Sequence, residues 1–248
     1  MARRGMSKSR TTFYTGLVII VTFGITIYAQ WNEISDAFGW NEAEYVTYAE
    51  GDPVVHFVNS RDRPASAQNA ARFIPFEFDY PASWDDWPGR EGTTVFLTGP
   101  KYRGADTRML MIAPVMLTRP GAQGEQRRES IREVMDQIAT SFGGSSQDFQ
   151  LLSSGPQMLG DRETTGFRFA YLERPDPGEG GDPMRLFGRG DIVFPAEGDL
   201  GIYVIALGTE AAPEFFTSAD IDDDPGFTLV FDTLRIGEAE LGHGKAAE

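Results

Sequence analysis

The stretch FIPFEFDYPASWDDW, residues 73–87, decides the fold. Aromatic residues occupy every second position from Phe76 to Tyr80, and the acids Glu77 and Asp79 lie between them. Alternation of this kind is typical of a β-strand with one face buried and the other in solvent. We therefore predict a strand that directs Phe76, Phe78 and Tyr80 into the core.

Pro81 follows this strand directly and predicts a corner in the chain. We expect Trp84 to fill the space between a sheet and a helix, as aromatic residues do in cores. Trp87, which precedes Pro88, is expected on the surface as a contact with a partner. Asp85 and Asp86 are not expected to act as a catalytic pair, because adjacent residues on a turn point apart.

The sequence further predicts one long amphipathic helix at 125–142, with strands before and after it in the chain. Gly143-Gly144 are expected to end this helix. A short helix is predicted at 210–220, and the segment 227–236 is predicted as a helix, with a strand as the alternative because its residues are β-prone. Further strands are predicted at 93–99, 107–118, 149–154, 165–173, 185–194 and 201–208. The order indicates an α+β fold, an antiparallel sheet flanked by helices.

Residues 13–31, FYTGLVIIVTFGITIYAQW, predict a transmembrane helix before this domain. No charge occurs in this segment, and its helix would rise about 28 Å, close to the thickness of the hydrocarbon layer. The segment also carries small and aromatic residues suited to contacts with another helix or with the membrane interface. These are Phe13, Tyr14, Gly16, Gly24, Tyr28 and Trp31.

Basic residues before the span and an acidic body after it predict the topology. The first eleven residues hold four basic residues and no acid, which leaves 18 of the 22 basic residues against all 37 acids, a net of about −19. We therefore expect a cytoplasmic N-terminus in the inner (cytoplasmic or intracytoplasmic) membrane and a periplasmic or lumenal main domain. A cleaved signal peptide is the alternative, but Ile27 would then occupy a position that favours a small side chain.

Five segments are therefore expected. They are a cytoplasmic tail (1–12), the transmembrane helix (13–31), an extended connector (32–71), the exported domain (72–237) and a loose C-terminal tail (238–248). Trp40, Tyr45 and Tyr48 of the connector are expected to contact lipid headgroups or a partner. Within the connector, 45–58 is expected to form a short hairpin or to lie on a neighbour.

The composition excludes several classes of function. The chain has no cysteine and only His56 and His243 as histidines, which argues against thiolate, histidine-triad and zinc chemistry. Its acidity argues against binding to nucleic acid. The loop DIDDDPG (220–226) places Asp220, Asp222 and Asp224 as weak calcium ligands, but Pro225 stands where such a loop needs glycine. The alternative is a charged turn in which Asp224 or a neighbour caps the next helix.

A strand that ends in aromatic-x-Tyr-Pro-x-x-Trp, here Phe78 to Trp84, resembles the PsbP-like family of α/β/α sandwiches. These proteins are extrinsic lumenal subunits of photosystem II and their bacterial relatives. The helix at 125–142 and the segments 164–172 and 201–210 are placed like later elements of the family, with an N-terminal membrane anchor added. The resemblance covers about residues 72–237 and implies a role without catalysis or cofactor.

The expected function is that of a single-pass accessory subunit that stabilises or helps to assemble a larger membrane complex. By family analogy this would be a photosynthetic reaction-centre, light-harvesting or electron-transport complex, whose other subunits would be its partners. The alternative is a membrane-anchored periplasmic module of the cell envelope that binds a lipid or another ligand in a pocket between sheet and helix.

Overall fold

The structure, a computed structural model, describes residues 45–60, 72–88, 93–102, 104–145, 147–173 and 183–237. They belong to a compact unit that begins at Tyr45. The predicted transmembrane helix at 13–31 and the C-terminal tail lie outside these residues. Within the described ranges, no helix has the length and apolar character needed to cross a membrane.

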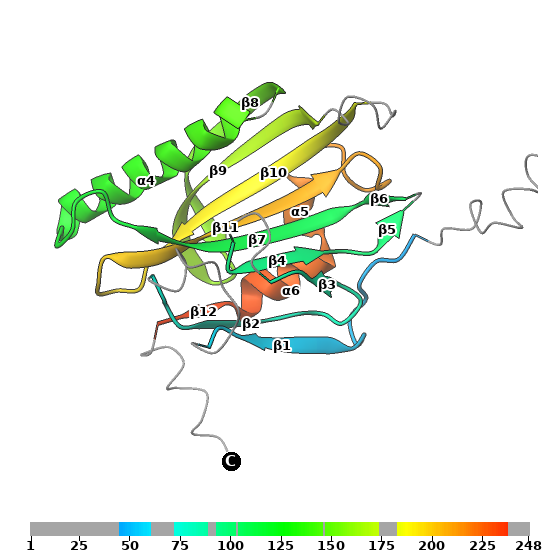
Figure 1. The fold of residues 1–248 in the computed structure, drawn as a ribbon, viewed down its shortest axis with the longest axis horizontal. Helices are drawn as coiled ribbons and strands as arrows, with labels where there is room; N and C mark the ends of the chain where they lie inside the picture. Colours follow the sequence, from blue (N-terminus) through cyan, green and yellow to red (C-terminus); the bar gives the residue numbers. More distant parts are fainter. Residues whose placement is uncertain are drawn as a thin grey trace, which may run out of the picture. The chain divides into compact units, whose positions relative to one another are not determined.

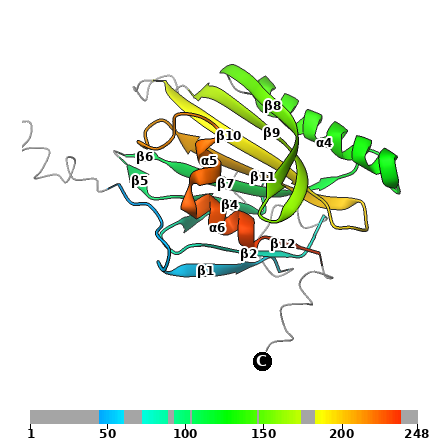
Figure 2. The same ribbon diagram turned by 180° about the vertical axis from the view of Figure 1, so that it is seen from behind.

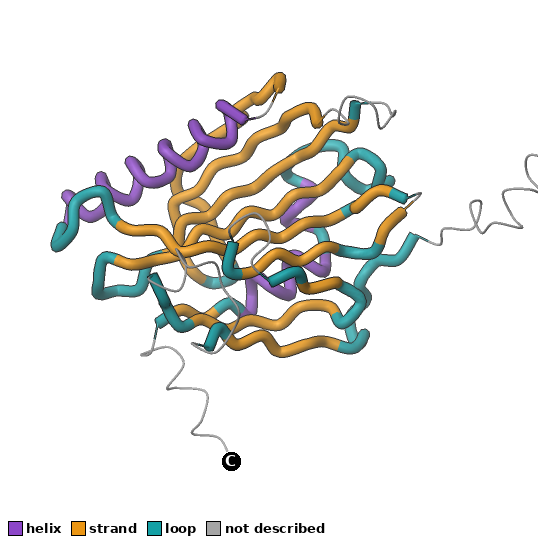
Figure 3. The backbone as a smooth tube through the Cα atoms, viewed as in Figure 1, coloured by secondary structure: helices purple, strands orange, loops and turns teal. Residues whose placement is uncertain are grey.

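A seven-stranded antiparallel sheet forms the centre of the unit, in the order β3-β4-β7-β11-β10-β9-β8 (Figures 1 and 3). After β7, the chain passes through α4 (Gly124–Ser145) to the far edge of the sheet and returns strand by strand until β11 pairs with β7. The strands are β3 (Asp85–Asp86), β4 (Val95–Thr98), β7 (Arg108–Met116), β8 (Gln147–Leu159), β9 (Arg162–Glu173), β10 (Met184–Val193) and β11 (Leu200–Thr209).

A second, three-stranded sheet has the order β1-β2-β12, and β5 (Lys101–Tyr102) pairs with β6 (Ala105–Asp106) in a small hairpin. The three strands are β1 (Val54–Val58), β2 (Phe76–Pro81) and β12 (Arg235–Ile236). Helix α4 covers one face of the large sheet, whereas α5 (Asp220–Asp223), α6 (Pro225–Thr233) and the small sheet lie on the other (Figures 1 and 2). This arrangement confirms the predicted α+β class.

The alternation of side chains along the central strands divides the interior into two cores. Leu110 and Ile112 belong to the core beneath α6, and Met111, between them, belongs to the core beneath α4. The central strands β7, β10 and β11 are therefore buried on both faces, which explains why they read as apolar runs. Burial of this extent is the main stabilising contribution to such a fold.

The stretch at 73–87 forms β2 and the corner after it, as predicted. Phe76, Phe78 and Tyr80 are buried, and Trp84 packs edge-on against Phe227 of α6 with the ring centroids 5.4 Å apart. Gly226 gives the indole its room, since a Cβ there would lie 2.7 Å from Trp84. The corner thus fixes α6 against the small sheet.

The boundary of the compact unit differs from the expected one near Arg72. Strand β1 lies within the predicted connector, but it pairs with β2 rather than forming a hairpin of its own. The Phe57 ring stacks on Phe78 with their centroids 4.8 Å apart, so this segment completes the core. Of the five residues of β1, only Phe57 is buried, so the segment gives a weak signal of core packing in the sequence.

Three predicted elements have different bounds in the structure. Helix α4 passes Gly143 and ends at Ser145. Gly143 leaves room for the Phe149 ring, since a Cβ at this position would lie 3.1 Å from it. The helix predicted at 210–220 is wrong, since residues 210–219 form turns around Pro213 and α5 begins only at Asp220. Segment 227–236 contains both predicted states, helix α6 followed by β12.

Candidate functional site

A groove of about 410 Å³ lies between the N-terminal half of α4 and the strands β8, β9 and β10. Pockets that hold small ligands have volumes of about 300–1,000 Å³, so the groove is large enough for one. Four arginines line it, Arg127, Arg128 and Arg132 from α4 and Arg162 from β9. We call these four residues and the space between them the arginine groove.

Arg127 forms the inner wall of the arginine groove and contacts neutral groups. Its Nη1 donates to the carbonyl oxygen of Gly198 and its Nη2 to that of Pro195, both at 2.8 Å. The guanidinium carbon also lies 5.7 Å from the centroid of the Phe194 ring. These contacts hold the side chain in place, but none of them supplies a negative charge to neutralise it.

Arg128 and Arg132 lie at the outer rim of the arginine groove. Arg128 pairs with Glu125, one turn earlier on α4, and both side chains are largely exposed, so the pair is weak. The Arg128 guanidinium lowers the pKa of Glu125, and Arg132 acts in the same direction. Over the described part of the chain, Arg132 has no carboxylate within ion-pair distance.

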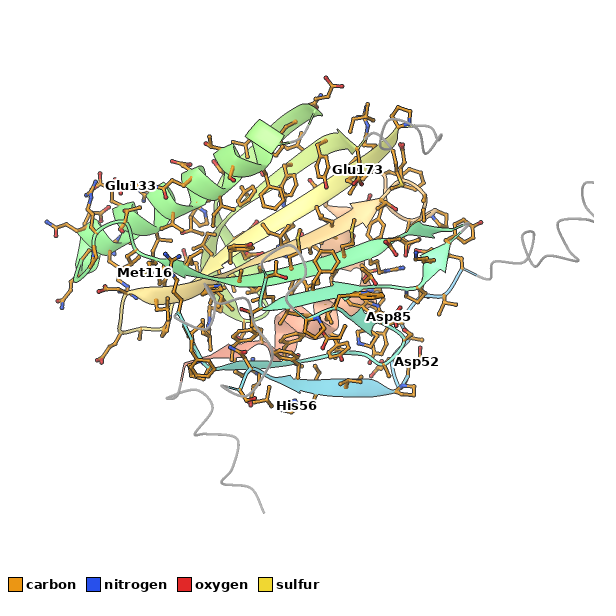
Figure 4. All side chains as sticks on the ribbon, viewed as in Figure 1. Asp52, His56, Asp85, Met116, Glu133 and Glu173 are labelled. Carbon is orange, nitrogen blue, oxygen red and sulfur yellow. The ribbon has the colours of Figure 1, made fainter. Side chains whose placement is uncertain are left out.

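Two other acidic side chains of α4, those of Glu129 and Glu133, both pair with Arg119, which precedes the helix. Figure 4 labels Glu133 on α4. Of the described residues that line the arginine groove, Glu163 alone is acidic. The groove is therefore a positively charged surface on a protein whose formal net charge is −15.

Arg108 of β7 has the opposite environment, because its side chain is only 3% exposed beneath α5 and α6. Its Nε donates to Asp224 Oδ2 at 2.7 Å, its Nη2 to the Tyr45 hydroxyl at 2.9 Å, and it also pairs with Glu214. Asp224 accepts a second hydrogen bond from the Phe227 amide at the start of α6. The buried cation thus joins β7 to the N-terminus of α6.

Arg189 of β10 is compensated in the same way. Its Nε donates to Asp191 Oδ2 at 2.8 Å and its Nη1 to Asp222 Oδ1 at 2.5 Å, while its guanidinium lies 4.6 Å from the Phe231 ring centroid. Asp191 also accepts from Gln157 and Thr164, both at 2.7 Å. Arg189-Gly190-Asp191 is therefore a buried structural cluster within a strand.

Glu214, which pairs with Arg108, has a perturbed ionisation. Burial raises its pKa to about 7, its own backbone amide opposes this rise, and the neighbouring Asp224 carboxylate adds to it. Its Oε1 accepts a hydrogen bond from Arg108, but Oε2 is buried without a hydrogen-bond partner. The protonated acid is therefore favoured to an unusually high pH.

The three aspartates considered as calcium ligands have separate partners. Asp220 accepts from the amides of Phe216 and Thr217, Asp222 pairs with Arg168 and Arg189, and Asp224 binds Arg108 and caps α6. No group of three or more metal-ligating side chains occurs in the residues that the structure describes. The capping role predicted for Asp224 is confirmed.

Comparison with solved structures finds a PsbP protein. The solution structure of PsbP (CyanoP) from the cyanobacterium Synechocystis is 10% identical over 77% of this chain and 98% of that one, with a TM-score of 0.38. The crystal structure of LpqN, involved in cell envelope biogenesis of Mycobacterium tuberculosis, is 9% identical over 77% of this chain and 98% of that one, with a TM-score of 0.44. No family model and no curated protein matches the sequence.

Three of the predicted contact residues lie in the described part of the chain. Tyr45 is half-buried, with its hydroxyl on Arg108 and its ring edge-on to Tyr102 at 5.3 Å, and Tyr48 is also half-buried. Trp87 is 47% exposed, and its indole donates to Thr98 Oγ1 at 3.1 Å. The other predicted contacts, Phe13, Tyr14, Gly16, Gly24, Tyr28, Trp31 and Trp40, lie outside the described residues.

Tyr45, Tyr48 and Trp87, the predicted contact residues that the structure describes, do not line the arginine groove. The α4 segment was interpreted by its apolar face, and no role was assigned to its arginines. A signal was present, because Arg127, Arg128 and Arg132 lie on adjacent faces of one helix while Glu129 and Glu133 lie on another. The contribution of Arg162 depends on the strand register and had no counterpart in the sequence pattern.

Proposed function

We propose that this chain is a non-catalytic, membrane-anchored binding module whose exported domain holds a ligand in the arginine groove. The observation that carries the proposal is a ligand-sized hollow lined by four arginines in a domain that is otherwise acidic. The groove lies between α4 and the large sheet, and its volume is within the range of pockets that hold small ligands. The segment at 13–31 would hold the domain at the membrane surface.

Native mass spectrometry of the full chain, purified in a mild detergent, tests this function. We expect one protein with one bound small molecule, and we expect Ala196→Trp, at the exposed rim of the groove, to abolish that adduct. Thr140→Trp, at an exposed position of α4 outside the groove lining, is the matched control and should retain it. Adducts of equal abundance in both variants would contradict the proposal.

A second candidate, an accessory subunit of a larger membrane complex, is favoured by the edge strand β8. From Phe149 to Leu159 it carries no charged residue, and Leu151, Leu152 and Met158 are each more than half exposed. Natural edge strands usually carry charges that prevent pairing with other chains, so a bare apolar edge suits a protein contact.

Copurification in mild detergent tests this second function. A stoichiometric complex is expected with the native chain and should be lost on Leu151→Glu/Leu152→Glu, whereas Thr140→Glu, which adds charge at an exposed position of α4 away from the β8 edge, should preserve it. Recovery of the chain without other subunits before any substitution would exclude this candidate.

A further inference from the structure

The arginine groove contains donors that the fold itself does not use. Arg132 has no ion-pair partner within the described ranges, and Arg128 has only the weak, exposed pair with Glu125. A guanidinium presents several N–H groups in a planar fork, which suits the oxygens of an anion. The rim can therefore bind an anionic group without breaking any buried contact.

The number of arginines discriminates between kinds of anion. A carboxylate has two oxygens and is satisfied by the fork of one guanidinium. A terminal phosphoryl group has three oxygens and up to two negative charges, so it can accept from several guanidinium groups at once. Arg128 and Arg132, one turn apart on α4, lie on the same wall of the groove as Arg127, and this clustering favours the phosphoryl group.

The remaining lining of the groove is largely apolar. Ile131 of α4, Pro156 of β8 and Phe194 after β10 lie among the arginines. A ligand that fills about 410 Å³ would therefore place an anionic end on the guanidinium groups and an apolar part on these side chains. That combination describes an amphiphile.

We propose that the arginine groove binds the phosphoryl group of an anionic amphiphile, with Arg128 and Arg132 as its principal contacts. This inference rests on the proposed function and names the class of ligand. A phosphoryl group occurs both in a lipid headgroup and in free phosphate, and the experiment below distinguishes between these two ligands.

Isothermal titration of the full chain in a neutral detergent tests the inference. Three probes are used, dihexanoyl phosphatidic acid, dihexanoylglycerol, which has the same acyl chains without phosphate, and inorganic phosphate. We expect the phosphatidic acid to bind more tightly than dihexanoylglycerol and its affinity to fall with added salt. Arg128→Gln/Arg132→Gln should weaken it about a hundredfold, because a hydrogen bond to a charged group contributes roughly a factor of ten.

Arg235→Gln is the matched control. It removes an exposed arginine from β12, on the other face of the large sheet, and should leave the affinity unchanged. Inorganic phosphate that binds as tightly as the phosphatidic acid would support phosphoryl recognition with free phosphate as the ligand. Tighter binding of the phosphatidic acid would support a lipid headgroup.

Two results distinguish failure of this inference from failure of the proposed function. Equal affinity for phosphatidic acid and dihexanoylglycerol, both lost in Ala196→Trp, would overturn the phosphoryl assignment and leave a ligand-binding groove. No binding of any probe, together with no copurified molecule that Ala196→Trp displaces, would overturn both. An unchanged affinity in Arg128→Gln/Arg132→Gln would also overturn the assignment.

Discussion

The arginines beneath α5 and α6 and those beside α4 carry the same charge in opposite environments. The side chains of Arg108 and Arg189 are no more than 5% exposed, and each binds two carboxylates. Arg127, in contrast, binds neutral carbonyl groups, and Arg132 has no ion pair in the described residues. A compensated buried cation joins secondary structure elements, whereas the exposed Arg128 and Arg132, with only a weak ion pair or none in the described residues, are available to a ligand.

The largest effect is expected from breaking the Arg189 cluster. Arg189→Met leaves Asp191, which is 1% exposed, without its cationic partner. Loss of one member of a buried ion pair costs about 3–5 kcal/mol, and we expect a decrease of this size in the free energy of unfolding. Urea titration followed by tryptophan fluorescence measures it, because Trp84 is buried in the folded domain.

Arg235→Met is the control for this experiment, since it removes an exposed arginine whose hydrogen bonds, within the described residues, go to backbone carbonyl groups. It should change the free energy of unfolding by less than about 0.5 kcal/mol. Equal effects of the two substitutions would mean that the buried cluster does not contribute specifically to stability.

A smaller effect separates the two roles of Asp224, which binds Arg108 and caps α6. Asp224→Ala removes both, while Asp224→Asn keeps an oxygen that can accept from the Phe227 amide. We expect Asn to be less destabilising than Ala by about 1 kcal/mol, the usual contribution of an N-cap. Urea titration of both variants measures the difference, and Asn as damaging as Ala would show that the charge alone matters.

The sequence predicted the architecture because most of its signals are local. The alternation of aromatic and acidic residues predicted β2, and the corner after it predicted a buried Trp84. The spacing of apolar residues at three and four positions predicted α4. Strand β1 was not recognised as part of the domain, because its pairing depends on contact with β2 rather than on its own residues. The arginine groove was missed for the same reason: Arg128 and Arg162 meet only after α4 crosses the sheet, and no local pattern records that crossover.

A pH-dependent effect is expected at Glu214. Its pKa is raised from 4.5 to about 7 in the folded chain, so the folded state keeps a proton that the unfolded state loses between these values. The stabilisation from this proton is complete below the unfolded pKa and is lost as the pH rises through about 7. Glu214→Gln resembles the protonated acid at every pH. The variant should therefore not show the loss of stability that deprotonation of Glu214 causes in the native chain.

Apparent melting temperatures of the native chain and of Glu214→Gln, measured between about pH 5 and pH 8, test this sign. The variant should gain relative to the native chain as the pH rises. Glu210→Gln is the control, because Glu210 is exposed and Gln can still accept the hydrogen bond from the Arg185 amide. A difference that stays constant over the range would contradict a raised pKa.

The smallest effect on stability is expected where the effect on binding is largest. Arg128→Gln/Arg132→Gln removes two exposed charges, one in a weak surface pair and one without an ion pair in the described residues. The free energy of unfolding should change by less than about 0.5 kcal/mol, because exposed ion pairs contribute little. Urea titration without ligand measures this change, and a loss of more than about 1 kcal/mol would assign these arginines to the fold. Unchanged stability together with weakened binding of phosphatidic acid would show that these arginines serve binding and not folding. Arg189→Met should behave differently, because it lowers the stability of the folded domain itself.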